Sequence, residues 1–592
     1  MLKGKKRNPL VYLFRRTWEF SGGNRKNVVL YLLMSVMSEL VETFWSPLVV
    51  SRIINLIQSK GITAESFRDL IFYLALFPIG DLIFWSLHGP SRVKEECNAF
   101  LARANLRRFQ LKGVMGLPLE WHSEHHSGDT IDRLEKGANS MYEFSSETFR
   151  FVKPIVKLLG CAGAIIYFSN ESVFIVLGAI GLSAWITVLI DGKCIGPQIR
   201  ELSQSENRIS ESVHDAINNI SSVIVLRVER FVFNSIMQRI MSPFDLFRKN
   251  TIQNEIKWFL TSLCCSLMMV LVLGTYFWDH YKSGEAIVIS SLYLLVSYLT
   301  QISSLFYEFT GLYGWTTRRM FRLLNSEELS EDFVSESMVN HVLPTNWKTI
   351  SVENLCFSYG VDRTEPHLDD VSFLIQRGEK VAVISRTGGG KTTLLKVMRD
   401  LYHPHKCRLY VDGELVDSGF EGISQDISMI QQNPEIFETT ILGNITLSAD
   451  YDPEIVRHYM DMACFTEVAD ALPKGLMSMI QEKGVNLSGG QVQRLALSRG
   501  LLASHNKGII LLDEPTSSLD PATAGTVFRN ILEGFRDKTV ISTLHSLQFL
   551  PLFDRVIVLE DGRIVGSGTI QELSRGCIVF QELWQRQFSE AS

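Results

Sequence analysis

The nine cysteines of the 592-residue sequence form no CxxC pair and no zinc-like spacing. The adjacent Cys264 and Cys265 lie within an apolar run, so we expect reduced thiols that serve packing rather than a metal site. The formal net charge is only −6, which gives no attraction to a polyanion, and no nucleic-acid partner is expected. The basic N-terminus lacks the apolar core and small-residue site of a cleavable signal, and is predicted to be a cytoplasmic tail.

Charged residues make up 21% of the chain, too few for an ordinary soluble protein and too many for one buried wholly in a membrane. The length favours two or more domains. Six windows before residue 325 are apolar enough to be predicted membrane spans. Three are almost free of charge (172–190, 258–278 and 286–306), and three carry charged residues (28–50 with Glu39 and Glu42, 70–87 with Asp81, and 155–168 with Lys157).

Connections between these windows alternate between a few residues and about sixty-five. The long connections, 89–153 and 191–257, have the polar and apolar period of helices, and are predicted to be rods that continue beyond the bilayer. The first of them holds ten lysines and arginines, whereas the three short loops hold four: Arg52, Lys60, Arg68 and Lys282. Because positive residues stay on the cytoplasmic side, both termini and the long connections are predicted to be cytoplasmic.

An acidic, serine-bearing stretch without a steady apolar period separates two regions of different composition. After it, short β-branched runs such as KVAVIS, GIILLDE, TVIST and RVIVL alternate with helical patterns, which predicts a mostly parallel sheet with helices around it. The expected domains are a cytoplasmic tail and elbow helix (1–26), a six-helix transmembrane domain (27–325), a linker (326–349) and an α/β domain (350–592).

The run VAVISRTGGGKTTLLK (381–396) combines a strand, a glycine-rich turn and the start of a helix, the pattern of a phosphate-binding loop. Lys391 would neutralise the outer phosphates of a nucleotide, and Thr392 would place its hydroxyl on Mg²⁺. The residues predicted to bind phosphate are Ser385, Arg386, Thr387, Gly388, Gly389, Gly390, Lys391, Thr392 and Thr393. Ser385 replaces the first glycine of GxxxxGK[ST] and lacks glycine's freedom at positive φ, but we expect binding to survive. A glycine turn with a chance lysine is the alternative interpretation.

The strand pattern GIILLDE (508–514) ends in two acids. Asp513 is predicted to hold Mg²⁺ through water, and Glu514 to polarise the water that attacks the γ-phosphate. Such acids could instead cap the next helix, but the phosphate loop upstream favours the catalytic interpretation.

Residues 487–491 read LSGGQ and precede the helical pattern VQRLALSRGLL. Ser488, Gly489 and Gly490 at a helix start form a second anion-binding end, with Gln491 in the same turn. This pentapeptide resembles the signature of the ABC transporters. In that family the phosphate loop of one subunit and the signature of the other bind the same ATP, so the resemblance implies a dimer.

Other residues occupy the positions of further family motifs. Tyr359 resembles the aromatic residue that stacks on adenine, and Gln432 the glutamine that links the metal and attacking water to the membrane domain. Asp520, in SSLD, lies in a sequence that resembles the loop coupling the two sites. His545 resembles the histidine that contacts the γ-phosphate.

The membrane half also resembles exporter-type members of the family. Residues 117–134 are similar to the first intracellular coupling region and residues 211–229 to the second. Glu482 and Gly484 resemble the loop that cross-links the two halves. An amphipathic helical hairpin is the alternative for the coupling regions, and only docking on the ATPase would make it functional.

The resemblance implies a fold class: an all-α six-helix membrane domain with long intracellular extensions, then an α/β P-loop ATPase with an α-helical signature subdomain. The implied function is ATP-driven export by alternating access, with ATP and Mg²⁺ as cofactors. The expected partners are a second half-transporter, in a homodimer or a heterodimer, the lipid bilayer, and a small amphipathic or peptide-like substrate. The expected location is a bacterial inner membrane. Uptake of a metal chelate, an ATP-gated channel, or a soluble ABC ATPase of DNA repair or translation are the alternatives.

Acids at membrane depth bear on the substrate. Glu39, Glu42, Asp81 and Glu308 could attract a cationic substrate. The favoured interpretation is that they pair with neighbouring helices or water.

Overall fold

The computed structural model describes residues 8–125, 127–168, 170–284, 286–333, 343–359, 366–432, 435–480 and 487–589. Glu482, Gly484 and part of the expected linker lie outside these residues. The chain forms two compact units. The first comprises Met1–Leu117 and Trp121–Ser335, and the second comprises Pro118–Glu120 and Glu336–Ser592.

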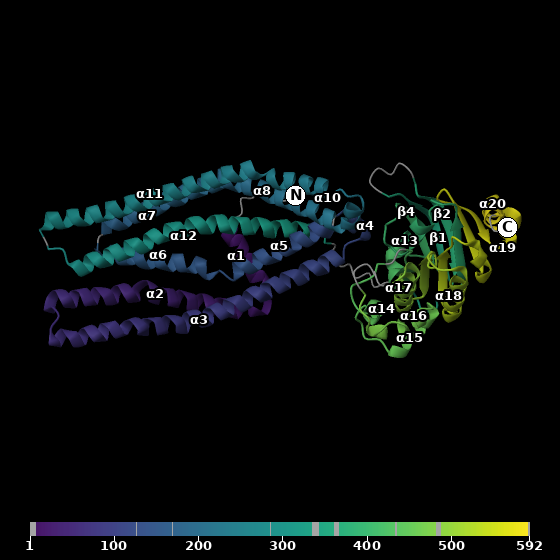
Figure 1. Ribbon diagram of the computed structural model, residues 1–592, viewed down its shortest axis with the longest axis horizontal. Coiled ribbons are helices and arrows are strands. Elements are labelled where there is room, and N and C mark those ends of the chain that lie inside the picture. The colour runs from purple at the N-terminus through teal and green to yellow at the C-terminus, as the bar shows by residue number, and fades with distance from the viewer. Residues whose placement is uncertain are drawn as a thin grey trace. The chain divides into compact units, whose positions relative to one another are not determined.

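The described part of the first unit is helical (Figure 1). In chain order its helices are α1 (Pro9–Phe20), α2 (Arg25–Lys60), α3 (Ala64–Met115), α4 (Leu119–Glu124), α5 (Ser127–Ser145), α6 (Phe149–Phe168), α7 (Asn170–Ile190), α8 (Gly196–Asn218), α9 (Ile220–Val225), α10 (Glu229–Met241), α11 (Phe244–Ser283) and α12 (Ile289–Glu328). Helix α2 packs beside α3, α7 beside α11, and α12 beside α6. The two predicted coupling regions contain the short helices α4 and α9.

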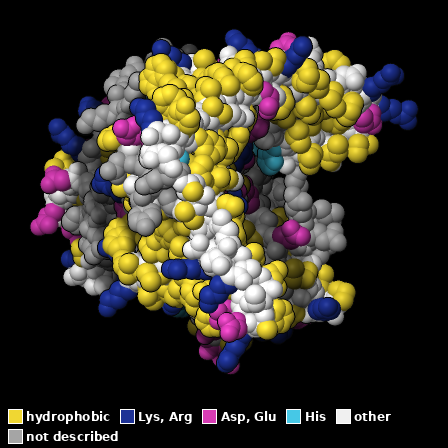
Figure 2. Space-filling view, turned by 90° about the vertical axis from the view of Figure 1, so that its left-hand side faces the viewer, with side chains coloured by type: hydrophobic (Ala, Val, Ile, Leu, Met, Phe, Trp, Pro, Cys, Tyr) yellow, Lys and Arg dark blue, Asp and Glu magenta, His cyan; other side chains and the backbone are white. Residues whose placement is uncertain are grey.

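Five helical stretches among the described residues are long and apolar enough to cross a membrane: Gly22–Lys60, Ala64–Met115, Glu171–Asn218, Glu229–Ser283 and Ile289–Glu331. Large apolar side chains remain exposed along them, as a lipid environment requires, including Trp85, Phe174 and Phe259. Hydrophobic side chains cover much of the end face of the molecule (Figure 2). Six spans were predicted, one of them at 155–168. That window lies on the 20-residue α6, which is not among the five stretches.

Two lysines of α6 form ion pairs with α2. Lys153 Nζ lies 3.0 Å from Glu42 Oε1 and 3.8 Å from Glu39 Oε2, and Lys157 Nζ lies 3.8 Å from Glu39 Oε1. Glu39 and Lys157 are largely buried. Charged groups at this depth are costly unless they are paired, and pairing was the favoured interpretation of Glu39 and Glu42.

The connection between α7 and α8 is a five-residue π-helix, η2 (Asp191–Ile195). Its first residue, Asp191, forms an ion pair with Lys257 of α11, with 2.9 Å between Asp191 Oδ1 and Lys257 Nζ. Both side chains are almost fully buried, at 5% and 3% exposure. The ion pair therefore joins the end of one long helix to the middle of another in the interior of the unit.

The second unit contains two sheets. Strands β1 (Thr349–Phe357), β2 (Leu368–Gln376), β4 (Lys406–Val411) and β5 (Glu414–Leu415) form an antiparallel sheet in the order β2-β1-β4-β5. Strands β3 (Lys380–Ser385), β6 (Ile427–Ile430), β7 (Ile509–Asp513), β8 (Thr539–Thr543), β9 (Arg555–Glu560) and β10 (Arg563–Gly568) form the other, in the order β10-β9-β3-β8-β7-β6. All its pairings are parallel except that of β10 with β9. The mostly parallel sheet predicted from the sequence is thus present.

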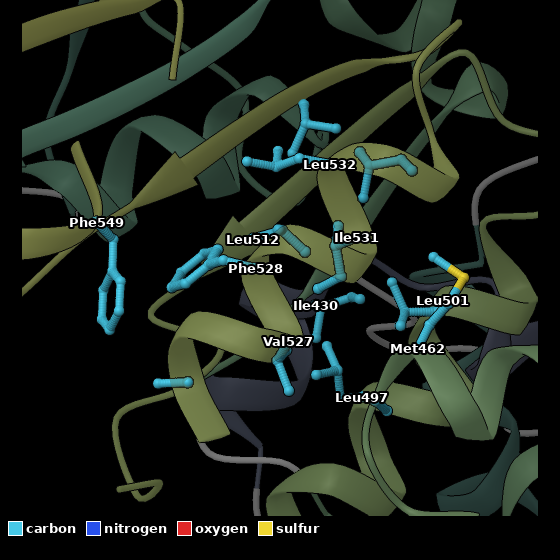
Figure 3. Close-up of a cluster of buried hydrophobic side chains, with 14 of the residues drawn as sticks. Ile430, Met462, Leu497, Leu501, Leu512, Val527, Phe528, Ile531, Leu532 and Phe549 are labelled. Carbon is cyan, nitrogen blue, oxygen red and sulfur yellow. The ribbon is translucent and has the colours of Figure 1, made fainter. Parts of the chain in front are cut away.

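Helices cover the parallel sheet. They are α13 (Lys391–Met398), α14 (Ile441–Thr446), α15 (Pro453–Met462), α16 (Thr466–Asp470), α17 (Gly489–Ala503), α18 (Pro521–Gly534), α19 (Ile570–Gly576) and α20 (Ile578–Ser589). Strand β3 is buried on both faces because its side chains alternate between two cores. Ala382 and Ile384 join the cluster in Figure 3, in which Ile430, Leu497 and Phe528 also pack. Val381 and Val383 face the antiparallel sheet.

Lys380, at the start of β3, has a buried ammonium group. Its Nζ donates hydrogen bonds to the carbonyl oxygens of Phe535 (2.8 Å), Gly378 (3.1 Å) and Arg536 (3.4 Å), and to that of Lys538. The first of these carbonyls follows α18, where a cation is favourable. Burial lowers the pKa of this ammonium group. One side chain therefore satisfies several carbonyl oxygens near the N-terminal end of β3.

We expect Lys380→Met to destabilise the second unit by about 2–3 kcal/mol, because these carbonyls would lose charge-assisted hydrogen bonds. The thermal midpoint of this unit should fall by roughly 5–10 °C. Thermal unfolding of the detergent-solubilised chain measures the shift. Lys406→Met, at an exposed position of β4, is the matched control and should change the midpoint little. Equal midpoints for the two variants would contradict the role of Lys380.

Candidate nucleotide-binding site

The predicted phosphate loop connects β3 to α13. Gly388 and Gly390 have φ values of +83° and +97°, a conformation that side chains with a Cβ rarely adopt. A Cβ on Gly390 would lie 3.0 Å from the His367 carbonyl oxygen, and one on Gly389 would lie 2.8 Å from Cβ of Ser385. The three glycines are therefore required by the path of the turn. Arg386, Thr387 and Gly388 are exposed.

Ser385 is the last residue of β3 and pairs with Leu559 of β9. It is not among the residues with positive φ, so a serine here causes no backbone strain. Its hydroxyl donates to the Arg386 carbonyl oxygen at 2.6 Å and lies 3.4 Å from Lys391 Nζ. The conformational freedom of glycine is thus not needed at this position.

We expect Ser385→Gly to change the affinity for ATP by no more than about threefold, since a single hydrogen bond to Lys391 is lost and the backbone path is unchanged. Equilibrium binding of a fluorescent ATP analogue measures this. The opposite expectation, that glycine restores a missing function, would be supported by a gain of tenfold or more.

The acid at the end of β7 meets the first turn of α13. Asp513 is 2% exposed. Its Oδ1 accepts hydrogen bonds from Thr392 Oγ1 at 3.0 Å and from Thr543 Oγ1 at 2.8 Å. Two of the three residues predicted from the sequence to hold a metal ion, Thr392 and Asp513, are therefore in direct contact, whereas the third, Gln432, contacts Glu514.

Glu514 brings three predicted residues together. Its Oε2 accepts a 2.5 Å hydrogen bond from Gln432 Nε2, and its Oε1 lies 3.8 Å from Lys391 Nζ. The backbone has φ +44°, in the left-handed region, and its N–H donates to Thr543 Oγ1 at 2.9 Å. The carboxylate is thus held next to the phosphate loop by side chains from two other segments.

Thr543 was not predicted from the sequence, although it contacts both acids. It ends β8, which pairs in parallel with β7, so that Thr543 lies opposite Asp513. The sequence signal that could have indicated Thr543 was a hydroxyl residue at the end of the strand before His545. His545 follows this strand with an exposed side chain.

Tyr359 lies beside the phosphate loop. Its hydroxyl donates to Thr393 Oγ1 at 3.3 Å, and its ring makes edge contacts with Phe357, His367 and Tyr402 at centroid distances of 4.9, 4.9 and 5.1 Å. The side chain is 36% exposed, so one face can receive a planar group. His367 and Tyr402, which orient this ring, were missed because they are separated from Tyr359 in the sequence.

The predicted signature begins α17. Ser488 is its N-cap, and it forms a reciprocal capping box with Gln491: the Ser488 N–H donates to Gln491 Oε1 at 2.9 Å, and the Gln491 N–H to Ser488 Oγ at 3.4 Å. A Cβ on Gly490 would lie 3.0 Å from the Ser518 carbonyl oxygen, so close packing requires glycine there. Gly489 has open space.

Gln493, also missed from the sequence, connects the signature helix to the loop that follows Glu514. It accepts from the Ser518 N–H at 2.9 Å and donates to Ser517 Oγ at 3.1 Å. Asp520 closes this loop as the N-cap of α18, where it accepts from the Thr523 N–H at 3.0 Å. That hydrogen bond holds the pKa of the Asp520 carboxyl below its usual range.

The signature and the phosphate loop of one chain do not meet. Among the described residues, no hydrogen bond or ion pair joins residues 488–491 to residues 385–393. The two segments predicted to bind phosphate are therefore not linked to each other within the described part of one chain.

Two family models match the chain and account for both units. Residues 28–299 match the model of the ABC transporter transmembrane region, and residues 368–517 match the model described as ABC transporter. The chain belongs to the ABC transporters. The fold class predicted from the sequence, a helical membrane region followed by an ATPase domain, is confirmed.

Three known proteins resemble this transporter over 81% to 96% of its length. An ATP-dependent lipid A-core flippase of Idiomarina loihiensis is 25% identical over 568 residues, covering 92% of this chain and 93% of the relative. Heavy metal tolerance factor 1 of Caenorhabditis elegans is 26% identical over 494 residues, covering 81% and 60%. A solved bacterial Atm1-family ABC exporter with ATP bound superposes with a TM-score of 0.84 at 21% identity, covering 96% of this chain and 99% of that one.

These findings support the half-transporter architecture and ATP-driven export. The transporter binds ATP, hydrolyses it to drive transport across a membrane, and has a fold that implies dimerisation.

Proposed function

We propose that this transporter works as a homodimer that exports an amphipathic or peptide-like molecule by alternating access. The observation that carries the proposal is the convergence on Glu514: Gln432 Nε2 lies 2.5 Å from its carboxylate and Lys391 Nζ lies 3.8 Å from it. This brings a cation, a water-orienting amide and a general base to the mouth of one phosphate loop.

In this proposal the outer phosphates of ATP take the place of Glu514 beside Lys391. The glycine N–H groups bind phosphate oxygens, and Tyr359 stacks on the adenine. Glu514, released from the lysine, polarises the attacking water, which Gln432 helps to orient. His545 contacts the γ-phosphate from the end of the neighbouring strand.

The oxygen atoms at the phosphate loop fit Mg²⁺. Thr392 Oγ1 and Asp513 Oδ1 are 3.0 Å apart, and both are hard ligands of the kind that this ion prefers. Thr392, Asp513 and Gln432 would hold the ion. It would supply positive charge against the β- and γ-phosphates.

The signature residues act on the nucleotide of the partner. Ser488, Gly489, Gly490 and Gln491 open a helix whose N-terminus favours an anion, and they make no hydrogen bond to the phosphate loop of their own chain among the described residues. Because every catalytic residue is present in this chain, two identical copies would form two competent sites. Two bound ATP molecules would close the dimer, and hydrolysis would release it.

The membrane unit bears on the substrate. Glu39 and Glu42 are paired with Lys153 and Lys157. Glu308 acts on the same cluster, and neither it nor Asp81 forms an ion pair among the described residues. A substrate that combines apolar surface with polar or charged groups would fit this mixture of exposed apolar side chains, paired charges and acids. The name of the bacterial relative, a flippase, supports outward movement of such a molecule in a bacterial inner membrane. The excess of lysine and arginine in the first long connection supports cytoplasmic termini.

Transport in proteoliposomes tests the proposal. The purified chain is reconstituted with its ATPase domain outward, and a panel of lipids, peptides and amphipathic cations is screened for stimulation of ATP hydrolysis. Stimulating compounds should accumulate inside the vesicles only with ATP. Entry that stops when the inside and outside concentrations are equal would indicate a channel, ATP-driven loss from the vesicles would indicate an importer, and stimulation by small cations alone would contradict the substrate class.

A further inference from the structure

The C-terminal helix α20 is anchored in the core of the second unit. Phe580 is fully buried, and its ring stacks on Trp584 at a centroid distance of 5.6 Å. Leu583 packs against the same core cluster. The helix also contacts β9, the strand next to β3 in the parallel sheet. Its polar side chains therefore project from a fixed platform.

One of these side chains reaches the phosphate loop. Glu582 forms an ion pair with Arg386 Nη2, in the turn between β3 and α13. The same guanidinium lies 3.3 Å from Glu560 at the end of β9. Arg386 is thus held by two acids, one at the end of β9 and one on α20.

A second side chain of α20 reaches the segment that carries His545. Gln587 Oε1 accepts a hydrogen bond from the Leu547 N–H at 2.8 Å, and Gln587 Nε2 donates to Ser546 Oγ at 3.2 Å. These are the two residues that directly follow His545. Both contacts of the amide lie in a partly buried environment, where an unmade hydrogen bond is costly.

We propose that Glu582 and Gln587 are positioning residues of the ATPase site: Glu582 holds the phosphate loop through Arg386, and Gln587 holds the segment of His545. The proposal rests on the nucleotide-binding role given above to the phosphate loop and to His545. In this proposal helix α20 acts through Arg386 and through the residues that follow His545. It fixes the distance between two parts of the site that come from separate strands, β3 and β8.

The two contacts should affect different kinetic parameters. The Glu582–Arg386 pair is about half exposed on both sides, and Glu560 remains when Glu582 is changed, so Glu582→Gln should raise KM for ATP about threefold and leave kcat within about twofold. Gln587→Ala leaves the Leu547 N–H without its acceptor and loosens the His545 segment. It should lower kcat about fivefold and leave KM within about twofold.

ATP hydrolysis by the full chain in lipid tests the proposal, with Gln585→Ala on the exposed side of α20 as the matched control. Gln587→Glu keeps the acceptor for the Leu547 N–H and should recover part of kcat. Adding Glu582→Gln to Arg386→Gln should raise KM no further, since both remove one pair.

The proposal is overturned if Glu582→Gln and Gln587→Ala behave as Gln585→Ala does. It is also overturned if both lower kcat and the thermal midpoint together, without a split between KM and kcat. Failure of the proposed site looks different: Glu514→Gln would then retain turnover. Loss of turnover in Glu514→Gln with normal α20 variants would reject the role of α20 alone.

Discussion

Glu514→Gln is expected to reduce ATP hydrolysis by at least about 100-fold while ATP binding is retained. The carboxylate is the only acid that the structure holds between Gln432 and Lys391 among the described residues, and loss of a general base costs about 10²–10⁴ in rate. The amide has the same shape and can still contact Gln432. Phosphate release measures turnover, and retention of labelled ATP after gel filtration measures the trapped nucleotide.

Glu533→Gln is a suitable control, because Glu533 is exposed on α18 in the same unit. It should hydrolyse ATP at the normal rate and release the nucleotide. If the Glu514 variant turned over ATP at more than a tenth of the normal rate, the assignment of the general base would be wrong.

Lys257→Met should destabilise the membrane unit by about 3–5 kcal/mol, because it leaves Asp191 buried without its cation. Asp191 Oδ2 already has no hydrogen-bond partner among the described residues, so no second hydrogen bond is in place to compensate. The midpoint of thermal unfolding in detergent, followed by monodispersity, measures the loss.

The double variant Lys257→Met with Asp191→Asn should recover most of this loss, since no unpaired charge then remains. Lys249→Met, at an exposed position of the same helix α11, is the control and should have little effect. A double variant no more stable than Lys257→Met would show that the ion pair is not the source of the effect.

The sequence predicted the parts of the site that are built from neighbouring residues. The phosphate loop and the signature are local: their glycines, caps and strand or helix periods lie within a few positions of each other, and Gly388, Gly390 and Ser488 have the conformations that those patterns require. The acids at the end of β7 were predicted for the same reason.

The missed residues act across strands or helices. Thr543 contacts Asp513 because β7 and β8 pair in register, and Gln493 contacts Ser518 because α17 packs on a loop. Lys153 and Glu42 are more than a hundred positions apart. A single sequence shows which groups need partners but contains no information on which distant groups supply them.

The membrane half illustrates the same limit. Apolar windows indicated the long helices. The window 155–168 is not among the five stretches; it lies on α6, whose two lysines are paired with acids of α2. The phosphate loop departs from the GxxxxGK[ST] pattern at one position, Ser385. The backbone accommodates this serine because its φ is not positive. Composition alone could not distinguish this harmless deviation from a damaging one.

The π-helix η2 sets the rotational phase of the rod that follows it. One residue of an α-helix corresponds to about 100° of turn, so the extra residue in a π-turn rotates every later side chain about the axis by that amount. Helix α7 is apolar on all sides, whereas α8 has one polar and one apolar face. The direction of that apolar face therefore depends on five residues, and deletion of one of them would turn the face of α8 away from its neighbours without changing any residue in it.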